Sequence, residues 1–358
     1  MFRIDSGQMR VFSLSKILAI VMILLGTLAL AGCSDILPRS SSLKAVQPLK
    51  QSALNRLSEI GSTPGAAMMV RIFKQSNEFE VWKQTKAGPF ALFKTYKICA
   101  WSGTLGPKVA EGDRQAPEGF YNITPALMNP NSNYYLSWNT GFPNKFDRAL
   151  GRTGANLMVH GDCSSAGCYS MTDESVAEIY ALARESFNGG NPVVQMEIFP
   201  FRMTPQNLAL VADNPNLPFW MNIKEGYDRF EISKTPPSWD VCDKKYVFDL
   251  KAPNGAALDA RAACPARSGD VLLASLTARE AADDAQFKTL VQQMAAQNAK
   301  AAAAQQASDQ EKASEKARGQ AIGGFFSGIL GGGKAQTTPA PAATTVVAPT
   351  PMPAPTFG

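Results

Sequence analysis

The only histidine of this 358-residue chain, His160, lies a short way before Cys168 in the segment His-Gly-Asp-Cys-Ser-Ser-Ala-Gly-Cys-Tyr. A cysteine thiol needs a base to become a nucleophilic thiolate near neutral pH, and imidazole is the side chain that titrates there. Glycines let the backbone approach a substrate and turn N–H groups toward a developing oxyanion. The segment predicts a nucleophilic cysteine, Cys168, that forms a thiolate–imidazolium pair with His160. Backbone N–H groups at Gly161, Gly167, Cys168 and Tyr169 are the candidate oxyanion donors.

The flanking residues predict the elements that hold this pair. Residues 156–159 have the composition of a strand, which would end at His160. Thr172 is a favourable helix N-cap, and Gly189 with Gly190 suits a helix end. One face of the intervening helix would carry the apolar side chains Val176, Ile179, Tyr180, Ala183 and Phe187. We therefore expect Cys168 on a strand–loop–helix connection.

Other short apolar segments bounded by turn residues predict strands. These segments are 68–73, 78–83, 90–101, 119–123, 134–138 and 193–198. Strands at this spacing, with few helices between them, favour a β-rich sandwich or barrel.

The segment around Cys168 resembles the catalytic motif of the L,D-transpeptidase catalytic domain family, also called YkuD-like. That motif is His-Gly, a loop of variable length, and then Ser-His-Gly-Cys followed by an aliphatic residue and Arg. His160-Gly161 and the Ser165-x-Gly167-Cys168 segment match it. The compact spacing is most similar to the YafK-like branch, and residues 102–108, 111–114 and 116–123 support the same resemblance.

Two positions depart from the family pattern. Ala166 stands where many members have a second histidine, and Ser170 stands where they have arginine. The resemblance covers residues 67–230. It implies a mainly β, YkuD-like catalytic domain with few helices.

The resemblance implies acyl transfer on peptidoglycan, with stem peptides and possible wall-attached lipoproteins as partners and a role in cell wall biogenesis or cell shape. Members that cross-link usually carry the histidine and arginine that are absent here, and the YafK-like branch includes an enzyme that releases a wall-bound lipoprotein by hydrolysis. We therefore favour hydrolysis of stem-peptide or protein–peptidoglycan links. Two alternatives stay open: an L,D-transpeptidase that forms cross-links or attaches protein to the wall, and a non-catalytic wall-binding lipoprotein.

Three arginines are candidates for binding a substrate carboxylate. Arg148 and Arg152 lie in an expected loop, and Arg202 could replace the arginine missing at position 170. The alternative for each is an ordinary solvated arginine. No cofactor is expected, and a single histidine without clustered cysteines gives no zinc site.

The N-terminal residues predict export and lipidation. Residues 1–32 combine basic residues with an apolar segment, 17–30, that is too short to span a membrane. They end before Cys33 in a sequence that resembles a bacterial lipobox, which would attach the chain to a membrane; an ordinary signal peptide is the alternative. Ser34 follows in place of aspartate, which favours the periplasmic face of the outer membrane. Residues 33–66 are polar and predict a tether.

The C-terminal part changes composition after a 231–276 extension. Residues 277–320 are rich in Ala, Gln and Lys and predict a helix, whose first half has an apolar face that includes Phe287. Residues 321–358 are Gly-rich and then rich in Pro, Thr and Ala, which predicts a break in the helix and a disordered tail.

Charge and cysteine usage agree with export. The net charge of +5 carries no basic stripe, so nucleic acid is not an expected partner, whereas an acidic polymer such as peptidoglycan is compatible. With one of six cysteines lipidated and one catalytic, four remain for an oxidising compartment. Cys242 and Cys264 are the favoured disulfide. For Cys163 the order of preference is a packed thiol, a partner of Cys99, and a redox partner of the catalytic cysteine.

Overall fold

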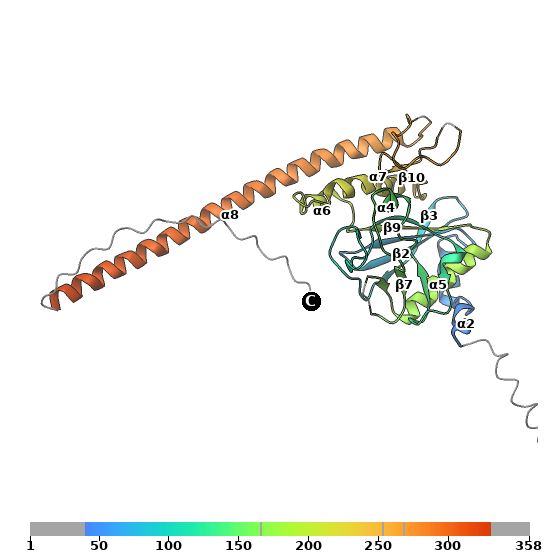
Figure 1. The fold of residues 1–358 in the computed structure, drawn as a ribbon, viewed down its shortest axis with the longest axis horizontal. Helices are drawn as coiled ribbons and strands as arrows, with labels where there is room; N and C mark the ends of the chain where they lie inside the picture. The colour runs from blue at the N-terminus through green and yellow to red at the C-terminus, as the bar shows by residue number, and fades with distance from the viewer. Residues whose placement is uncertain (1–39, 165–166, 253, 268, 331–358) are drawn as a thin grey trace, which may run out of the picture. The chain divides into compact units, whose positions relative to one another are not determined.

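The computed structural model describes residues 40–164, 167–252, 254–267 and 269–330. The chain divides into two compact units, Met1–Gln292 and Gln293–Gly358. The first unit holds the sheets and the helices that cover them (Figure 1).

A five-stranded mixed sheet forms the centre of the first unit. Its order is β3-β2-β1-β9-β4. The strands are β1 Met68–Phe73, β2 Glu78–Gln84, β3 Phe90–Lys97, β4 Gly119–Ile123 and β9 Val194–Phe199. β1 pairs in parallel with β9, and the other neighbours are antiparallel. All five correspond to strands expected from the sequence.

A smaller four-stranded sheet, of order β5-β6-β7-β8, carries the residues singled out above. Its strands are β5 Met128–Asn129, β6 Ser137–Asn139, β7 Met158–His160 and β8 Tyr169–Ser170. β7 pairs in parallel with β8 and antiparallel with β6. The predicted strand end at His160 is confirmed.

Helices take a larger share of the fold than the sequence suggested. They are α2 Ser40–Ala45, α3 Gln51–Glu59, the 3-10 turn η1 Pro125–Leu127, α4 Lys145–Ala149, α5 Asp173–Asn188, α6 Pro205–Ala209, α7 Leu217–Ser233 and α8 Leu273–Leu330. The described residues form no closed barrel. The fold is therefore mixed α/β, and the expectation of a mainly β sandwich or barrel is corrected to that extent.

α5 matches its prediction closely. The Thr172 side chain accepts a hydrogen bond from the Ser175 N–H and caps the first turn. Val176 and Ile179 are buried on the face that packs near β1 and β7. Because α5 begins directly after β8, it braces the connection that carries Cys168.

α7 lies across an aromatic cluster that the sequence did not reveal. Gly226, in the middle of this helix, looks like a helix breaker. A Cβ at that position would lie 2.5 Å from the rings of Phe120 and Phe248, so only glycine permits this close approach. Trp220 is fully buried in the same cluster. The expected boundary at residue 230 falls inside α7.

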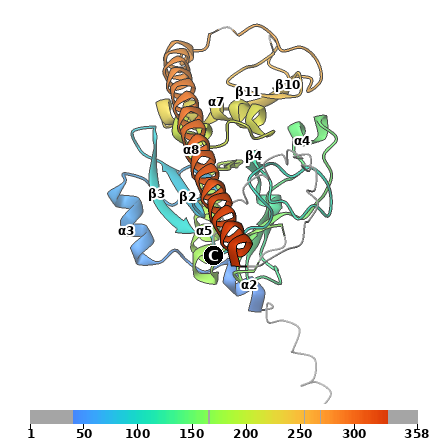
Figure 2. The same ribbon diagram turned by 90° about the vertical axis from the view of Figure 1, so that its left-hand side faces the viewer.

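The described part of the expected tether is packed on the domain. Ala53 and Leu57 of α3 are buried in the main core. Arg56 donates to the carbonyl oxygens of Leu92 and Phe93 in β3 at 3.0 and 2.9 Å, and Figure 2 shows α3 beside this strand. The folded part thus begins before residue 67. A tether remains a proposal for the residues before Ser40, which lie outside the described ones together with Cys33.

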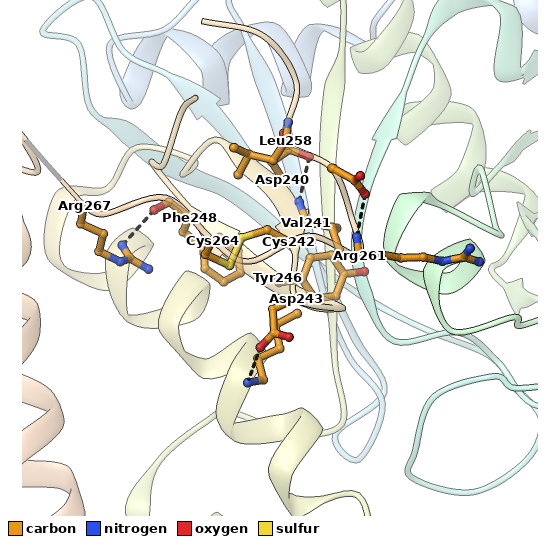
Figure 3. The surroundings of a disulfide bond; sticks show 12 residues. Asp240, Val241, Cys242, Asp243, Tyr246, Phe248, Leu258, Arg261, Cys264 and Arg267 are labelled. Carbon is orange, nitrogen blue, oxygen red and sulfur yellow. Dashed lines mark hydrogen bonds and ion pairs between the residues drawn. A yellow bond between two sulfur atoms is a disulfide. The ribbon is translucent and has the colours of Figure 1, made fainter. Parts of the chain in front are cut away.

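The C-terminal elements extend the same unit. The hairpin of β10 Trp239–Cys242 and β11 Lys245–Phe248 packs on α7. The Cys242–Cys264 disulfide, predicted from the sequence, joins β10 to the segment after β11 with Cα atoms 5.2 Å apart (Figure 3).

α8 includes the predicted helix 277–320. Phe287 packs against the aromatic cluster, as expected for its first half. The helix continues through Gly323 and Gly324, where the sequence predicted a break. The expected disordered segment 336–358 lies outside the described residues. Within the described part of the chain, no helix has the length and apolar character needed to cross a membrane.

Candidate active site around Cys168 and His160

The parallel pairing of β7 with β8 brings Cys168 and His160 to one face of the small sheet. Val159 pairs with Tyr169, and both side chains are fully buried in the core. The Met158 N–H points at the Cys168 Sγ, 3.3 Å away. Since successive side chains of a strand point to opposite faces, Cys168, Met158 and His160 lie on the face away from that core.

A cavity of about 470 Å³ opens on this face. We call it the His160 cavity. Its lining consists of Asn129, Ser132, Asn133, Tyr134, Ser137, Asn156, Met158, His160, Ser164 and Cys168. The sequence-predicted nucleophile and base therefore share one cavity, whose other walls are mostly amide and hydroxyl side chains suited to peptide groups.

The His160 ring is held in one orientation. Its Nδ1 lies 2.5 Å from the carbonyl oxygen of Gly161. A carbonyl oxygen only accepts hydrogen bonds, so Nδ1 carries the hydrogen and Nε2 is the basic nitrogen. The ring of Tyr134 stacks obliquely on the imidazole, with 4.9 Å between centroids. The sequence could not locate a third group to orient the candidate base, and this backbone carbonyl is the group that contacts the ring.

The surroundings of Cys168 favour a neutral thiol in the resting protein. Burial raises the pKa of the Cys168 thiol above its ordinary value, and the hydrogen bond from the Met158 N–H only partly opposes this. The thiolate–imidazolium pair expected from the sequence stays a prediction, and it would form as His160 takes the thiol proton. A neutral thiol requires His160 to remove the proton as the nucleophile attacks.

The backbone of Gly161 is hydrogen-bonded within the fold and closely packed. Its N–H donates to the carbonyl oxygens of Tyr134 and Leu136 at 3.0 and 3.2 Å, so it is engaged and does not serve as an oxyanion donor. A Cβ at this position would lie 2.5 Å from the Asp173 Oδ1, which restricts it to glycine. The sequence-based role of Gly161 is corrected accordingly.

The other three candidate donors belong to Cys168 and its two neighbours in the chain. Gly167 adopts φ 131°, a conformation that glycine allows and other residues rarely adopt. Tyr169 is fixed in the core, where its hydroxyl donates to the Pro117 carbonyl oxygen at 2.7 Å. The backbone of residues 167–169 is thereby anchored around Cys168.

A second disulfide ties Cys163, which lies between His160 and Cys168 in the chain, to the segment after β3. Cys99 and Cys163 are bonded, with Cα atoms 5.1 Å apart, which corrects the preference for a packed thiol at Cys163. The Cys99 N–H donates to the Ser170 carbonyl oxygen at 2.9 Å, and the Cys163 N–H to that of Met171 at 3.2 Å. The Ser170 hydroxyl is itself buried and donates to the Ala100 carbonyl oxygen at 3.0 Å.

The three candidate arginines are used elsewhere. Arg148 donates to a backbone carbonyl at the start of α4. The other two form ion pairs, Arg152 with Asp147 at 2.9 Å and Arg202 with Glu78 and Glu80 at 2.6 and 2.7 Å. None of the three is among the described residues that line a cavity with Cys168. The structure therefore does not bring them to the site.

The sequence analysis did not identify two residues that the structure places at the site. Tyr134 was expected only as part of a strand, and its contact with His160 depends on the turn before β6. Asn156 was expected as a strand residue, yet it precedes β7 and lines the cavity. An aromatic or amide side chain in such a segment has no spacing pattern that would have identified it.

The comparisons with known proteins agree with the motif. No family model matches the chain. Over 184 residues it is 41% identical to a protein of Escherichia coli K12 provisionally named L,D-transpeptidase YafK; the match covers 51% of this chain and 74% of that protein. A protein of the same name from Escherichia coli O157:H7 matches to the same extent.

Two solved structures are more distant. Pgp2, a helical cell shape determining protein of Campylobacter jejuni, is 22% identical over 41% of this chain and 54% of its own, with a TM-score of 0.30. Bd1075 of Bdellovibrio bacteriovorus is 18% identical, and the match covers 40% of this chain and 51% of that chain with a TM-score of 0.27. This chain spans about half the length of these solved chains, and such TM-scores do not define a shared fold. The identity and coverage of the YafK match show that the chain belongs to the L,D-transpeptidase family.

Proposed function

We propose that the protein is a cysteine acyl-transfer enzyme acting on peptidoglycan, in which Cys168 is the nucleophile and His160 the base. The observation that carries the proposal is the shared cavity, with the Nδ1 of His160 bonded to the Gly161 carbonyl. That bond leaves the basic Nε2 for the thiol proton. The relationship to YafK supports peptidoglycan stem peptides as the substrate class.

The reaction begins with a neutral thiol and a neutral imidazole. The Nε2 of His160 takes the thiol proton while Sγ of Cys168 bonds to the scissile carbonyl carbon. The carbonyl oxygen becomes an oxyanion near the backbone N–H groups of residues 167–169. The intermediate collapses as Nε2 returns the proton to the leaving amine, which yields a thioester on Cys168. Water or an amine, deprotonated by Nε2, then attacks the thioester and restores the thiol.

We favour hydrolysis of stem-peptide or protein–peptidoglycan links as the second step. The buried Ser170 hydroxyl is bonded to the protein, so position 170 offers no cation to the substrate where cross-linking relatives have arginine. The alternative is transfer to an amine, which forms cross-links or attaches protein to the wall. Incubation of the enzyme with a donor stem peptide and an excess of a D-amino acid separates them. If the enzyme is a hydrolase, the main product should be the donor peptide with a free carboxylic acid. If the main product carries the D-amino acid instead, transfer is favoured.

A non-catalytic wall-binding lipoprotein is the alternative from another class. The Cys168→Ala variant distinguishes it, because a binding protein would keep its wall-related phenotype with that substitution whereas an enzyme would not. The exposed Ser52→Ala change in α3 provides a matched control.

We also propose that the chain is exported and anchored by lipid on Cys33, at the periplasmic face of the outer membrane. The support is the sequence of residues 17–34. Cys33→Ala should move the protein from the membrane fraction to soluble or unprocessed fractions. An unchanged membrane fraction, with no lipid on the peptide that starts at Cys33, would contradict the anchor.

A further inference from the structure

One peptide group connects His160 to the start of α5. Its carbonyl oxygen belongs to Gly161 and lies 2.5 Å from the Nδ1 of His160. Its N–H belongs to Asp162 and donates to the Oδ1 of Asp173, the first residue of α5, at 2.9 Å. A carboxylate therefore contacts the same rigid amide group whose oxygen holds the imidazole.

The planarity of this amide makes the two contacts interdependent. The Gly161–Asp162 peptide is trans. In a trans peptide the C=O and the N–H point in opposite directions within one plane. Because the Asp162 N–H points at Asp173, the Gly161 oxygen must point away from that carboxylate, and on this side it meets the His160 ring.

The backbone after Gly161 has a conformation that needs such a restraint. Asp162 and Cys163 both have left-handed backbones, with φ of 68° and 40°. Residues other than glycine adopt this conformation at a cost and keep it where the surrounding structure enforces it. The Cys163 N–H is held by the Met171 carbonyl oxygen at 3.2 Å, whereas the Asp162 N–H is held by the Asp173 side chain. The carboxylate is therefore the contact that orients the peptide plane between residues 161 and 162.

Packing fixes the carboxylate against the turn. A Cβ on Gly161 would lie 2.5 Å from the Asp173 Oδ1 and 2.9 Å from the Cβ of Tyr135. The next residue of α5, Glu174, is also acidic, but it is exposed and forms an ion pair with Lys50. Both acidic side chains suit the positive start of a helix. Asp173 is the one of the two that contacts the turn after His160.

We propose that Asp173 is a positioning residue that acts on His160 through the Gly161–Asp162 peptide. Its hydrogen bond orients the peptide plane, and its negative charge polarises the amide, so that the Gly161 oxygen is a stronger acceptor for the hydrogen on Nδ1. Because Asp173 is exposed, solvent weakens the polarisation, and orientation is the larger contribution. The effect on turnover rests on the proposed function, whereas the orientation of the ring does not.

The single histidine of the chain makes the state of the ring directly measurable. Full-length protein is labelled with [15N]histidine and purified through a tag that contains no histidine, so its spectrum holds one imidazole. At alkaline pH, where an imidazole is neutral, the two 15N chemical shifts report which nitrogen carries the hydrogen. In the wild-type protein it should be on Nδ1.

Asp173→Ala removes the acceptor for the Asp162 N–H. A measurable fraction of the imidazole should then carry its hydrogen on Nε2, and kcat should fall about threefold to tenfold. KM should change little, because Asp173 is not among the described residues that line the His160 cavity. Asp173→Ser keeps a side chain suited to a helix start and should give the same shift, which provides a second variant if Asp173→Ala does not fold.

Two further variants separate positioning from a general effect on α5. Asp173→Asn keeps an oxygen that can accept from the Asp162 N–H, so it should retain the hydrogen on Nδ1 and recover most of the kcat lost in Asp173→Ala. Glu174→Ala removes a negative charge from the same helix turn and should change neither quantity. An unchanged ring in both Asp173→Ala and Asp173→Ser, or an equal shift in Glu174→Ala, would overturn the proposal. Equal losses in Asp173→Ala and Asp173→Asn would do so as well.

The spectra and the turnover measurements fail independently. A shift of the hydrogen to Nε2 in Asp173→Ala, together with no turnover by the wild-type protein, would leave the positioning of His160 standing and defeat the proposed function. Turnover by the wild-type protein, with an unchanged ring in Asp173→Ala, would do the reverse.

Discussion

The Nδ1 of His160 is 2.5 Å from the carbonyl oxygen of Gly161, the residue that follows it in the chain. The proposed catalytic base is thus oriented by its own backbone, at a glycine whose N–H is bonded to the turn before β6 and which has no room for a Cβ. This arrangement places the proton on Nδ1 and leaves Nε2 as the basic nitrogen, and no carboxylate among the described residues forms an ion pair with the ring.

The pH dependence of thiol alkylation tests the protonation state of Cys168. Because burial raises its pKa, the thiolate fraction is small at neutral pH and grows as pH rises through a value above that of an ordinary thiol, about 8.5. The rate of alkylation by iodoacetamide, followed by peptide mapping, should have its midpoint above that value. The unfolded protein should show the ordinary midpoint. A midpoint below neutrality would restore the thiolate–imidazolium pair.

The ring of Tyr134 should matter through its contact with His160. Tyr134→Ala removes stacking worth about 1 kcal/mol, so kcat should fall several-fold to tenfold. Tyr134→Phe keeps the ring and should keep kcat. If the two substitutions reduce kcat equally, the hydroxyl rather than the ring is responsible.

The two disulfides should have separable effects. Replacing Cys242 and Cys264 by serine opens a link between residues 22 positions apart, which should lower the free energy of unfolding by about 3 kcal/mol. Since this link is on the β10–β11 hairpin, kcat/KM of the folded protein should not change. Urea unfolding and turnover measure the two quantities.

Replacing Cys99 and Cys163 by serine should lower both stability and kcat/KM, because this disulfide anchors Cys163, which lies between His160 and Cys168 in the chain. Unchanged kcat/KM in this variant would mean that the loop is positioned by its hydrogen bonds alone.

The packing of α3 predicts a stability effect in a region expected to be a tether. Leu57 is 1% exposed, so Leu57→Ala should destabilise the domain by about 2–5 kcal/mol. The exposed Ser52→Ala, in the same helix, should have little effect on the melting temperature. Equal melting temperatures for both variants would indicate that α3 does not contribute to the folded domain.

The sequence predicted the elements whose signals are local. β1 and β4 have the expected bounds, since each is a short apolar segment between turn residues, and α5 begins after the expected cap, Thr172. The motif also led directly to Cys168 and His160, which the structure places in one cavity.

Features that depend on distant contacts were missed. α7 contains Gly226, and a glycine is required there because the rings of Phe120 and Phe248 approach the helix backbone closely. The Cys99–Cys163 bond, which the sequence analysis ranked second for Cys163, depends on the pairing around β8, so no spacing rule could have ranked it first. The raised pKa of Cys168 follows from burial, which a motif does not report.

The most direct test of the account is the mass of the protein after mixing with donor stem peptide and quenching in acid. The account predicts an adduct equal to the acyl group, carried by the peptide that contains Cys168 and removed by hydroxylamine as a thioester. It should be absent from Cys168→Ala and strongly reduced in His160→Ala. Turnover of the donor by Cys168→Ala at the wild-type rate, or an acyl group on another residue, would contradict the account.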